Sequence, residues 1–430
     1  MTVQNNGKPF RLWMGDMYSI IISDPILIRE IFVKNFNNFI NRTDMPSIHL
    51  ISSNYLSLSA SSDEYWKNAK NVMTQGFTQS FKKMTKEITM DEIGKFIVAL
   101  QPFAKSQESI QPRKYCQTLI MNIILRFVVG KSINYTECKQ DRQLIDELIK
   151  PMEDVFAHLG GHHLGDFVGF LKPLYLFYLL NFHDPAENFK KYFDHQIRIH
   201  QETFDPDNIR DFLDVLLSNF HKLDNNLEIV RALAQDLLNA GTETTSTTLE
   251  WFFLSMANNI DIQEKAYNEL KLIVGKENRL INVNDRQYTP YTNALIKEVM
   301  RRYPILPLGL LRKSKEEIQL SDGTLIPKDT IIFPNLHYSF TSERYWDQSK
   351  DFNPDRFLNN NHSEVFYPFG IGPRGCIGQA FAQDIEYISI TNILLNFKIT
   401  TTNGKTIDET ELFSITVHPN IFSTTLESRY

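Results

Sequence analysis

Apolar residues recur at helical spacing over most of the chain before Pro304. The clearest stretches place apolar side chains three and four positions apart, and they cover 115–129, 141–149, 188–202 and 211–220. Short groups of Asp, Asn, Gly and Pro separate these stretches, as they commonly do between consecutive helices. A longer stretch, 226–258, keeps the same spacing throughout. The pattern therefore predicts a mainly helical protein.

The two ends of the chain carry the signs of β-structure. Residues 10–14 and 18–22 flank Gly15-Asp16, which predicts a hairpin, and Asp24-Pro25 then predicts the start of a helix. Beyond Pro304 we expect short strands at 318–320 and 330–333 around the turn 321–323, and further strand in 413–430. No linker separates these parts, so we predict one mainly α domain with a minor β portion over residues 1–430.

Composition and charge exclude several classes of protein. The chain has 430 residues, 42% of them apolar, and a formal net charge of −6, which argues against nucleic acid as a general partner. Its three cysteines, Cys116, Cys138 and Cys376, are odd in number and widely spaced. We therefore expect no disulfide framework and no structural zinc site, and we expect a reducing compartment.

The most apolar stretch, 167–182, is interrupted by Lys172-Pro173 and is too short to cross a bilayer. Our first interpretation is a buried helix–turn–helix. The second is a surface that dips into a membrane, and both stay open here.

Cys376 lies in a loop rich in glycine, with Gly370, Gly372, Gly375 and Gly378 around it. Glycine permits positive φ and lets the backbone approach a flat ligand. Such a loop can aim N–H groups at a sulfur anion, and a helix beginning near Ile377 would favour the same anion, so we expect a lowered thiol pKa. A lone cysteine beside a glycine turn is, however, usually structural.

The long stretch 226–258 contains Ala240-Gly241 followed by a cluster of hydroxyl residues at 242–248. Glycine inside a helix costs up to about 1 kcal/mol relative to alanine, and threonine hydroxyls can bond back to carbonyls. Either the helix ends at this cluster, or the hydroxyl residues have a functional role within a continuous helix. The apolar run 249–256 favours a continuous helix.

Glu298 and Arg301 are three residues apart and share a helix face, and Arg356 follows within 352–357. A Glu-x-x-Arg pair is usually an exposed ion pair that stabilises its helix by about 0.2–0.5 kcal/mol.

Taken together and in this order, these motifs resemble the cytochrome P450 family. The ten residues 369–378 match its haem signature Phe-x-x-Gly-x-Arg-x-Cys-x-Gly at every defined position. The resemblance extends over nearly the whole chain and implies the P450 fold, with haem b held by the Cys376 thiolate. It also implies that Phe369 and Gly370 belong to the haem-binding loop.

The resemblance assigns roles to further residues. Ala240 and Gly241 would leave room for dioxygen, Thr244 would hydrogen-bond the bound oxygen, and Glu243 would relay protons. Contacts to the haem are expected from a group of four residues: Trp66, Lys70 (where the family usually has Arg), Arg312 and Arg374. A structural network is expected from Glu298, Arg301 and Arg356.

By the same resemblance, the protein is expected to insert one atom of O2 into a lipophilic substrate. No flavin or nicotinamide fingerprint is present in the sequence, so electrons would come from a separate NADPH-cytochrome P450 reductase, docking near Lys67, Lys70 and Arg374. Microsomal members reside on the cytosolic face of the endoplasmic reticulum. Their N-terminal membrane anchor and hinge have no counterpart here, so a soluble cytoplasmic form is the alternative expectation.

Two other functions stay open: a haem-thiolate isomerase or dehydratase, and an inactive truncated relative that only binds haem or ligand. The presence of Glu243-Thr244 favours the monooxygenase. We expect mostly apolar segments to line the substrate pocket: the region after Arg42, 164–180, 237–244, 305–310 and the surroundings of Ile421.

Overall fold

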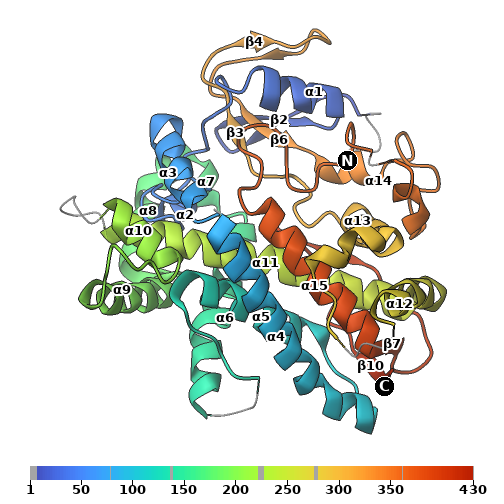
Figure 1. Ribbon diagram of the computed structural model, residues 1–430. Helices are drawn as coiled ribbons and strands as arrows, with labels where there is room; N and C mark the ends of the chain where they lie inside the picture. Colours follow the sequence, from blue (N-terminus) through green and yellow to red (C-terminus); the bar gives the residue numbers. More distant parts are fainter. Residues whose placement is uncertain are drawn as a thin grey trace.

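The computed structural model describes residues 7–77, 79–135, 139–220, 227–275, 279–360 and 362–429 (Figure 1). Cys138 lies outside these ranges. No helix among the described residues is long and apolar enough to cross a membrane.

The long helix α11, Leu227–Asn258, runs through the centre of the molecule (Figure 1). It packs against α5, Pro112–Val129, and α15, Gln379–Asn396, while α4, Gln79–Ser106, packs against both of these helices. Helix α5 is buried on nearly every face because α4 and α11 lie on either side of it. The predicted helices at 115–129 and 226–258 are therefore confirmed, and they form the core that carries the site.

The other helices surround this core, and the predicted helices at 188–202 and 211–220 are among them. The remaining helical elements are α1 Pro25–Arg29, η2 Glu30–Lys34, α2 Pro46–Ile51, α3 Asp63–Gln75, α6 Lys139–Gly160, α7 Leu164–Phe167, η3 Gly169–Leu171, α8 Lys172–Phe182, α9 Glu187–Glu202, α10 Phe212–Phe220, α12 Ile260–Val274, η4 Val283–Tyr288, α13 Pro290–Arg302, α14 Leu336–Thr341 and η5 Pro354–Phe357.

The main sheet joins the N-terminal hairpin to two strands from residues 312–334. Strands β1, Phe10–Met14, and β2, Met17–Ile22, form the predicted hairpin, and β2 runs parallel to β6, Ile331–Pro334. The short strand β3, Arg312–Lys313, completes the order β1-β2-β6-β3. This sheet places the N-terminal hairpin beside β6 and β3 at the top of Figure 1, whereas the C-terminus lies at the bottom.

The pairing around the turn 321–323 differs from the prediction. That turn joins β4, Ile318–Gln319, to β5, Leu325–Ile326, a strand that the sequence pattern did not show. Strand β6 instead lies between β2 and β3, because this position buries its isoleucines and satisfies both of its edges.

The C-terminal tail is not one strand but three short ones. Strands β8, Glu411–Phe413, and β9, Val417–Pro419, pair with each other, and β10, Thr424–Ser428, pairs with β7, Phe397–Thr401.

The apolar stretch at 167–182 is exposed, so our first interpretation of a buried helix–turn–helix is wrong. Phe170 is 77% exposed and Phe182 is 73% exposed, and within α8 only Leu179 is buried. The helix is apolar all round, but only part of its surface packs against α2, α7 and η3. The exposed apolar side chains of this stretch are not covered by any of the residues that the structure describes.

Candidate active site

A cavity of about 310 Å³ lies between α11 and the cysteine loop. Cys376 forms part of one wall, and Ala240 and Thr244 of α11 form part of another. Most of the lining is apolar, and it includes Leu237, Ile305, Leu306 and Leu310, as the sequence predicted. The prediction is wrong for 164–180 and Ile421, which do not line this cavity.

The cysteine loop is closed by its own backbone. The N–H of Cys376 donates to the carbonyl of Phe369 at 2.8 Å, and the N–H of Gly375 donates to that of Gly372 at 2.9 Å. Gly370 and Gly372 have φ of +76° and +75°, which side chains with a Cβ rarely adopt. A Cβ on Gly372 would also lie 2.1 Å from the carbonyl oxygen of Phe32. Only glycine therefore fits where the loop meets η2.

The expected low thiol pKa is not what the protein provides. The Cys376 side chain is exposed to the cavity, but desolvation by the surrounding protein raises its pKa, a backbone hydrogen bond with Gly378 acts in the opposite direction, and the negative charge of Glu386 raises the pKa further. Helix α15 begins only at Gln379, so its positive end lies further from the sulfur than the sequence suggested. None of the described groups that shift this pKa carries a positive charge.

Three guanidinium groups lie along the same cavity: Arg312, Arg374 and Arg42. Burial lowers the pKa of each, and the charge of a neighbouring arginine lowers the pKa of Arg312 and Arg374 further. Asp236 is the carboxylate near Arg42, but it is already held by Ser59. From the sequence, Arg42 was only a landmark of the pocket, and its membership of this cluster was missed.

Several polar atoms of this cluster have no protein partner. Nε and Nη1 of Arg312 and Nε of Arg374 are buried without a hydrogen bond among the described residues. Arg374 donates through its other nitrogens to the carbonyls of Ile40, Leu58 and Ser61. Buried donors with no acceptor are costly, so the cluster fits a ligand that brings carboxylates, as the propionates of haem do.

Trp66 and Lys70 lie beside the same cluster on α3. The Trp66 ring is buried, 4.7 Å from the Arg374 guanidinium carbon and 5.2 Å from Lys70 Nζ. Lys70 Nζ donates to the carbonyl of Pro373, which ties α3 to the cysteine loop. Lys70 therefore stabilises the position of the cysteine loop, in addition to its predicted contact with haem.

Helix α11 continues without a break through its glycine and threonines. The Thr244 hydroxyl donates to the carbonyl of Ala240 at 2.7 Å, and that of Thr248 donates to Thr244 at 3.0 Å, the expected back-bonding. Gly241 contacts the cavity, but a Cβ there would lie 3.2 Å from Ile124 Cδ1 on α5. Its small size therefore also serves the close packing of α11 on α5.

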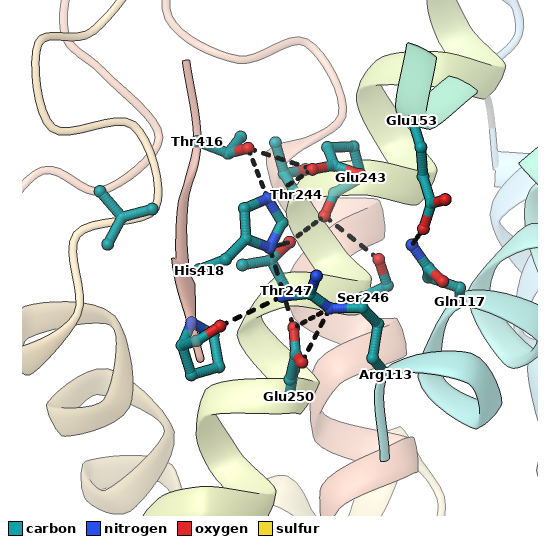
Figure 2. A network of polar contacts seen from close by, with 12 residues as sticks. Arg113, Gln117, Glu153, Glu243, Thr244, Ser246, Thr247, Glu250, Thr416 and His418 are labelled. Atoms are coloured by element: carbon teal, nitrogen blue, oxygen red, sulfur yellow. Dashed lines mark hydrogen bonds and ion pairs between the residues drawn. The ribbon is translucent and has the colours of Figure 1, made fainter. Parts of the chain in front are cut away.

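Glu243 is buried and does not line the cavity. Its Oε1 lies 2.8 Å from Nε2 of His418 and accepts a hydrogen bond from Thr416 Oγ1 at 3.0 Å (Figure 2). Both partners come from the C-terminal segment around β9, and Thr416 is 173 residues away in sequence. Nothing in the sequence pattern links these residues, so sequence reasoning missed them.

Glu298 and Arg301 form a fully buried pair on α13. Arg301 donates to the Glu298 carboxylate through Nε at 2.7 Å and Nη2 at 2.8 Å. Glu298 also accepts from the backbone of Asn353 at 2.9 Å and lies 3.6 Å from Nε of Arg356. The structure thus brings the three sequence-predicted residues together and adds Asn353.

Glu386 is a further buried acid in the cavity wall. Burial raises the pKa of this carboxyl to about 8, although Arg286 and Thr248 act in the opposite direction. An acidic residue within the apolar run of α15 was the only signal that could have drawn attention to it.

Comparisons with known proteins agree in naming one family. The family described as Cytochrome P450 matches residues 2–425. Probable cytochrome P450 508A1 of Dictyostelium discoideum is 37% identical over 98% of this chain and 87% of its own, and probable cytochrome P450 508A2 of the same organism is 34% identical over 98% and 88%. A zebrafish cytochrome P450 solved with progesterone superposes with a TM-score of 0.87, at 23% identity, over 99% of this chain and 97% of its own.

Proposed function

Since the chain belongs to the cytochrome P450 family and is a monooxygenase of that family, we propose that the Cys376 thiolate would hold the iron of its haem b and that Thr244 and Glu243 handle protons for the reaction. The supporting observation is that Cys376 and Thr244 line one cavity, from different walls.

The reaction is R–H + O2 + NADPH + H⁺ → R–OH + H2O + NADP⁺. Haem supplies the chemistry of oxygen activation when it is bound. Arg312 and Arg374, together with Arg42, would hold its carboxylates, and these negative charges would relieve the mutual repulsion of the three arginines. Thr244 lines the cavity, and its hydroxyl donates to the carbonyl of Ala240 in this structure, so it would have to turn away from that carbonyl to donate to dioxygen in the cavity. The apolar walls exclude water and admit a lipophilic substrate.

The spectrum of the reduced, carbonyl-bound protein tests the central assignment. A thiolate ligand shifts the main absorption band far to the red, and Cys376→Ala should abolish that shift. Cys116→Ala is the matched control, because Cys116 is a fully buried thiol of α5. A band at the position of histidine-ligated haem in the unaltered protein, or an unchanged band in Cys376→Ala, would refute the assignment.

An NADPH-cytochrome P450 reductase is the proposed electron donor, and α3 is the proposed docking region. Lys67 is half exposed there and pairs with Glu64, whereas Arg374 is turned inward. Lys67→Glu should therefore slow reduction by the reductase, and an unchanged rate would remove this surface. Consumption of NADPH linked to hydroxylated product also separates the monooxygenase from an isomerase, which consumes none.

The proposed substrate is a lipophilic small molecule. The support is the apolar lining of the cavity and, by analogy, the zebrafish cytochrome P450 whose structure was solved with the steroid progesterone. Titration of the haem spectrum with progesterone and with lauric acid tests this proposal, since displacement of water from the iron changes the spectrum. No response to either probe class would argue against it.

We also propose peripheral contact with a membrane through the exposed apolar surface of α7, η3 and α8, on the cytosolic face of the endoplasmic reticulum. Large apolar side chains gather there: Leu164, Phe170, Leu174, Phe177, Tyr178, Leu180 and Phe182. Large exposed apolar side chains gathered on neighbouring short elements are typical of an interaction surface. The double variant Phe170→Ser/Phe177→Ser should lose binding to phosphatidylcholine vesicles, and Leu272→Ser, an equally exposed site on α12, should retain it.

A further inference from the structure

The acid of the central helix is directed away from the cavity, toward the C-terminal hairpin. Glu243 contacts His418 of β9 (Figure 2), whereas the next residue, Thr244, lines the cavity. A carboxylate that relays protons to the cavity has to receive them from elsewhere. The ionisable side chain that contacts Glu243 on the side away from the cavity is His418.

Charged side chains of alternating sign continue outward from Glu243. His418 Nδ1 lies 3.8 Å from Oε2 of Glu250, which lies about two turns beyond Glu243 along α11 in the same network. Arg113 of α5 donates to Glu250 through Nε at 2.9 Å and 3.1 Å, and its side chain is 30% exposed. The network thus leads from a buried carboxylate to the protein surface.

The imidazole of His418 is positioned to carry a positive charge. The ionisable side chains that face it are Glu243 and Glu250 of α11 and Arg113 of α5, and the hydroxyls of Thr416 and Thr247 lie 2.8 Å and 3.4 Å from its nitrogens. Burial lowers the pKa of His418, but the hydrogen bond to Glu243, the charge of Glu243 and the nearby carboxylate of Glu250 together outweigh burial and raise it to about 9. The side chain also remains 19% exposed, so solvent can reach it.

A purely structural role would be to fasten β9 to α11. That attachment already exists without His418, because the indole of Trp251 donates to the carbonyl of Val417 at 2.9 Å. The N–H of Val417 also donates to the carbonyl of Ile305 at 2.9 Å. Fastening the hairpin therefore does not account for a charged imidazole at this position.

We propose that His418 is the residue through which Glu243 is reprotonated from solvent, a role that rests on the function proposed above for Glu243. The Nε2 proton of the imidazolium passes to Oε1 of Glu243 and leaves a neutral imidazole with its hydrogen on Nδ1. A solvent proton then restores the cation at Nε2. Rotation of the protonated Glu243 side chain brings the proton to the Thr244 side of α11.

Nitrogen NMR of histidine-labelled, reduced, carbonyl-bound holoprotein tests the pairing without turnover. His418→Gln assigns the signal, and His195→Gln, an exposed histidine of α9, is the matched control. We expect His418 to titrate near pH 9, and we expect this midpoint to fall by at least about one pH unit in Glu243→Gln. A titration near the ordinary histidine value, or no change in Glu243→Gln, would overturn the proposal.

Turnover with NADPH and reductase but no organic substrate tests the relay itself. Oxygen then leaves either as peroxide, from one NADPH, or as water, from two. In His418→Gln we expect the share leaving as water to fall about tenfold, with the carbonyl-bound spectrum unchanged. His418→Arg retains a cation beside Glu243 but cannot release a proton, so it should behave like His418→Gln.

The outcomes separate the two proposals. If His418→Arg restores the normal share of water, His418 only positions Glu243 and the relay is wrong. If His418→Gln behaves as the unaltered protein while Glu243→Gln is impaired, the relay fails and the role of Glu243 stands. If Glu243→Gln itself behaves normally, the role proposed for Glu243 fails first.

Discussion

Removal of the Glu298 carboxylate should destabilise the whole protein by about 4 kcal/mol. In the structure this carboxylate is fully buried and accepts hydrogen bonds from Nε and Nη2 of Arg301, whose side chain is also fully buried. In Glu298→Gln one oxygen is replaced by an NH2 group that faces a guanidinium N–H. The variant therefore leaves a buried positive charge without its counter-charge, which typically costs about 3–5 kcal/mol.

The expected change in melting temperature follows from the length of the chain. At about 2.1 cal/mol/K per residue, 430 residues unfold with an entropy of roughly 0.9 kcal/mol/K, so 4 kcal/mol lowers the melting temperature by about 4–5 °C. Haem should also be lost earlier, because Glu298 holds the N–H of Asn353 in the segment that precedes the cysteine loop. Thermal melting at a fixed scan rate, followed by circular dichroism and haem absorbance, measures both effects.

The exposed pair Lys67–Glu64 provides the matched control. It has the same spacing of three residues and an N–O distance of 2.9 Å, but its side chains are 48% and 73% exposed. Glu64→Gln should therefore change the stability by less than about 0.5 kcal/mol. If Glu298→Gln melts within about 1 °C of the unaltered protein, the reasoning from burial is wrong.

Other consequences can be checked in the same preparations. Urea unfolding should show that Gly372→Ala lowers the free energy of unfolding by about 3 kcal/mol, because the new Cβ clashes with backbone and φ is positive. Gly404→Ala, where φ is similar but the space is open, should lower it by only about 1 kcal/mol. Arg312→Ala should release haem to apomyoglobin at least about tenfold faster, and an unchanged rate would remove it from the haem contacts. Thr244→Ala should release more peroxide per NADPH with the same carbonyl-bound spectrum, and normal stoichiometry would exclude it from the mechanism. The pKa of His418 is raised from 6.5 to about 9, so its ion pairs should contribute about 3 kcal/mol to the free energy of unfolding below pH 6.5. This contribution should be lost as the pH rises through 9. If His418→Gln melts with the same pH dependence as the unaltered protein, the ion pairing is contradicted.

Local patterns predicted the elements of the fold well wherever the physical cause was local. Helical spacing located α5, α9, α10 and α11, and the hairpin at Gly15-Asp16 followed from turn chemistry. Strand pairing was predicted less well. The place of β6 beside β2 depends on residues more than 300 positions apart, and no local pattern specifies such a partner.

Burial was the other quantity that the sequence could not supply. The same apolar composition predicted a buried segment at 167–182, but the exposed side chains of α8 show that only packing partners decide burial. The pKa of Cys376 behaved similarly: the glycine loop and the following helix suggested a lowered value, but desolvation by the surrounding protein outweighs both.

Some residues of the candidate site could likewise be predicted from local patterns, and others could not. The sequence by itself determined the residues whose spacing is short and whose chemistry is specific: the loop around Cys376, the pair Glu243-Thr244 and the pair Glu298–Arg301. Only the folded chain places Arg42 beside Arg312 and Arg374, and His418 beside Glu243. The reason is physical: a motif is recognisable when its residues share one turn or one loop, whereas an ion pair between distant segments exists only once the core has brought them together.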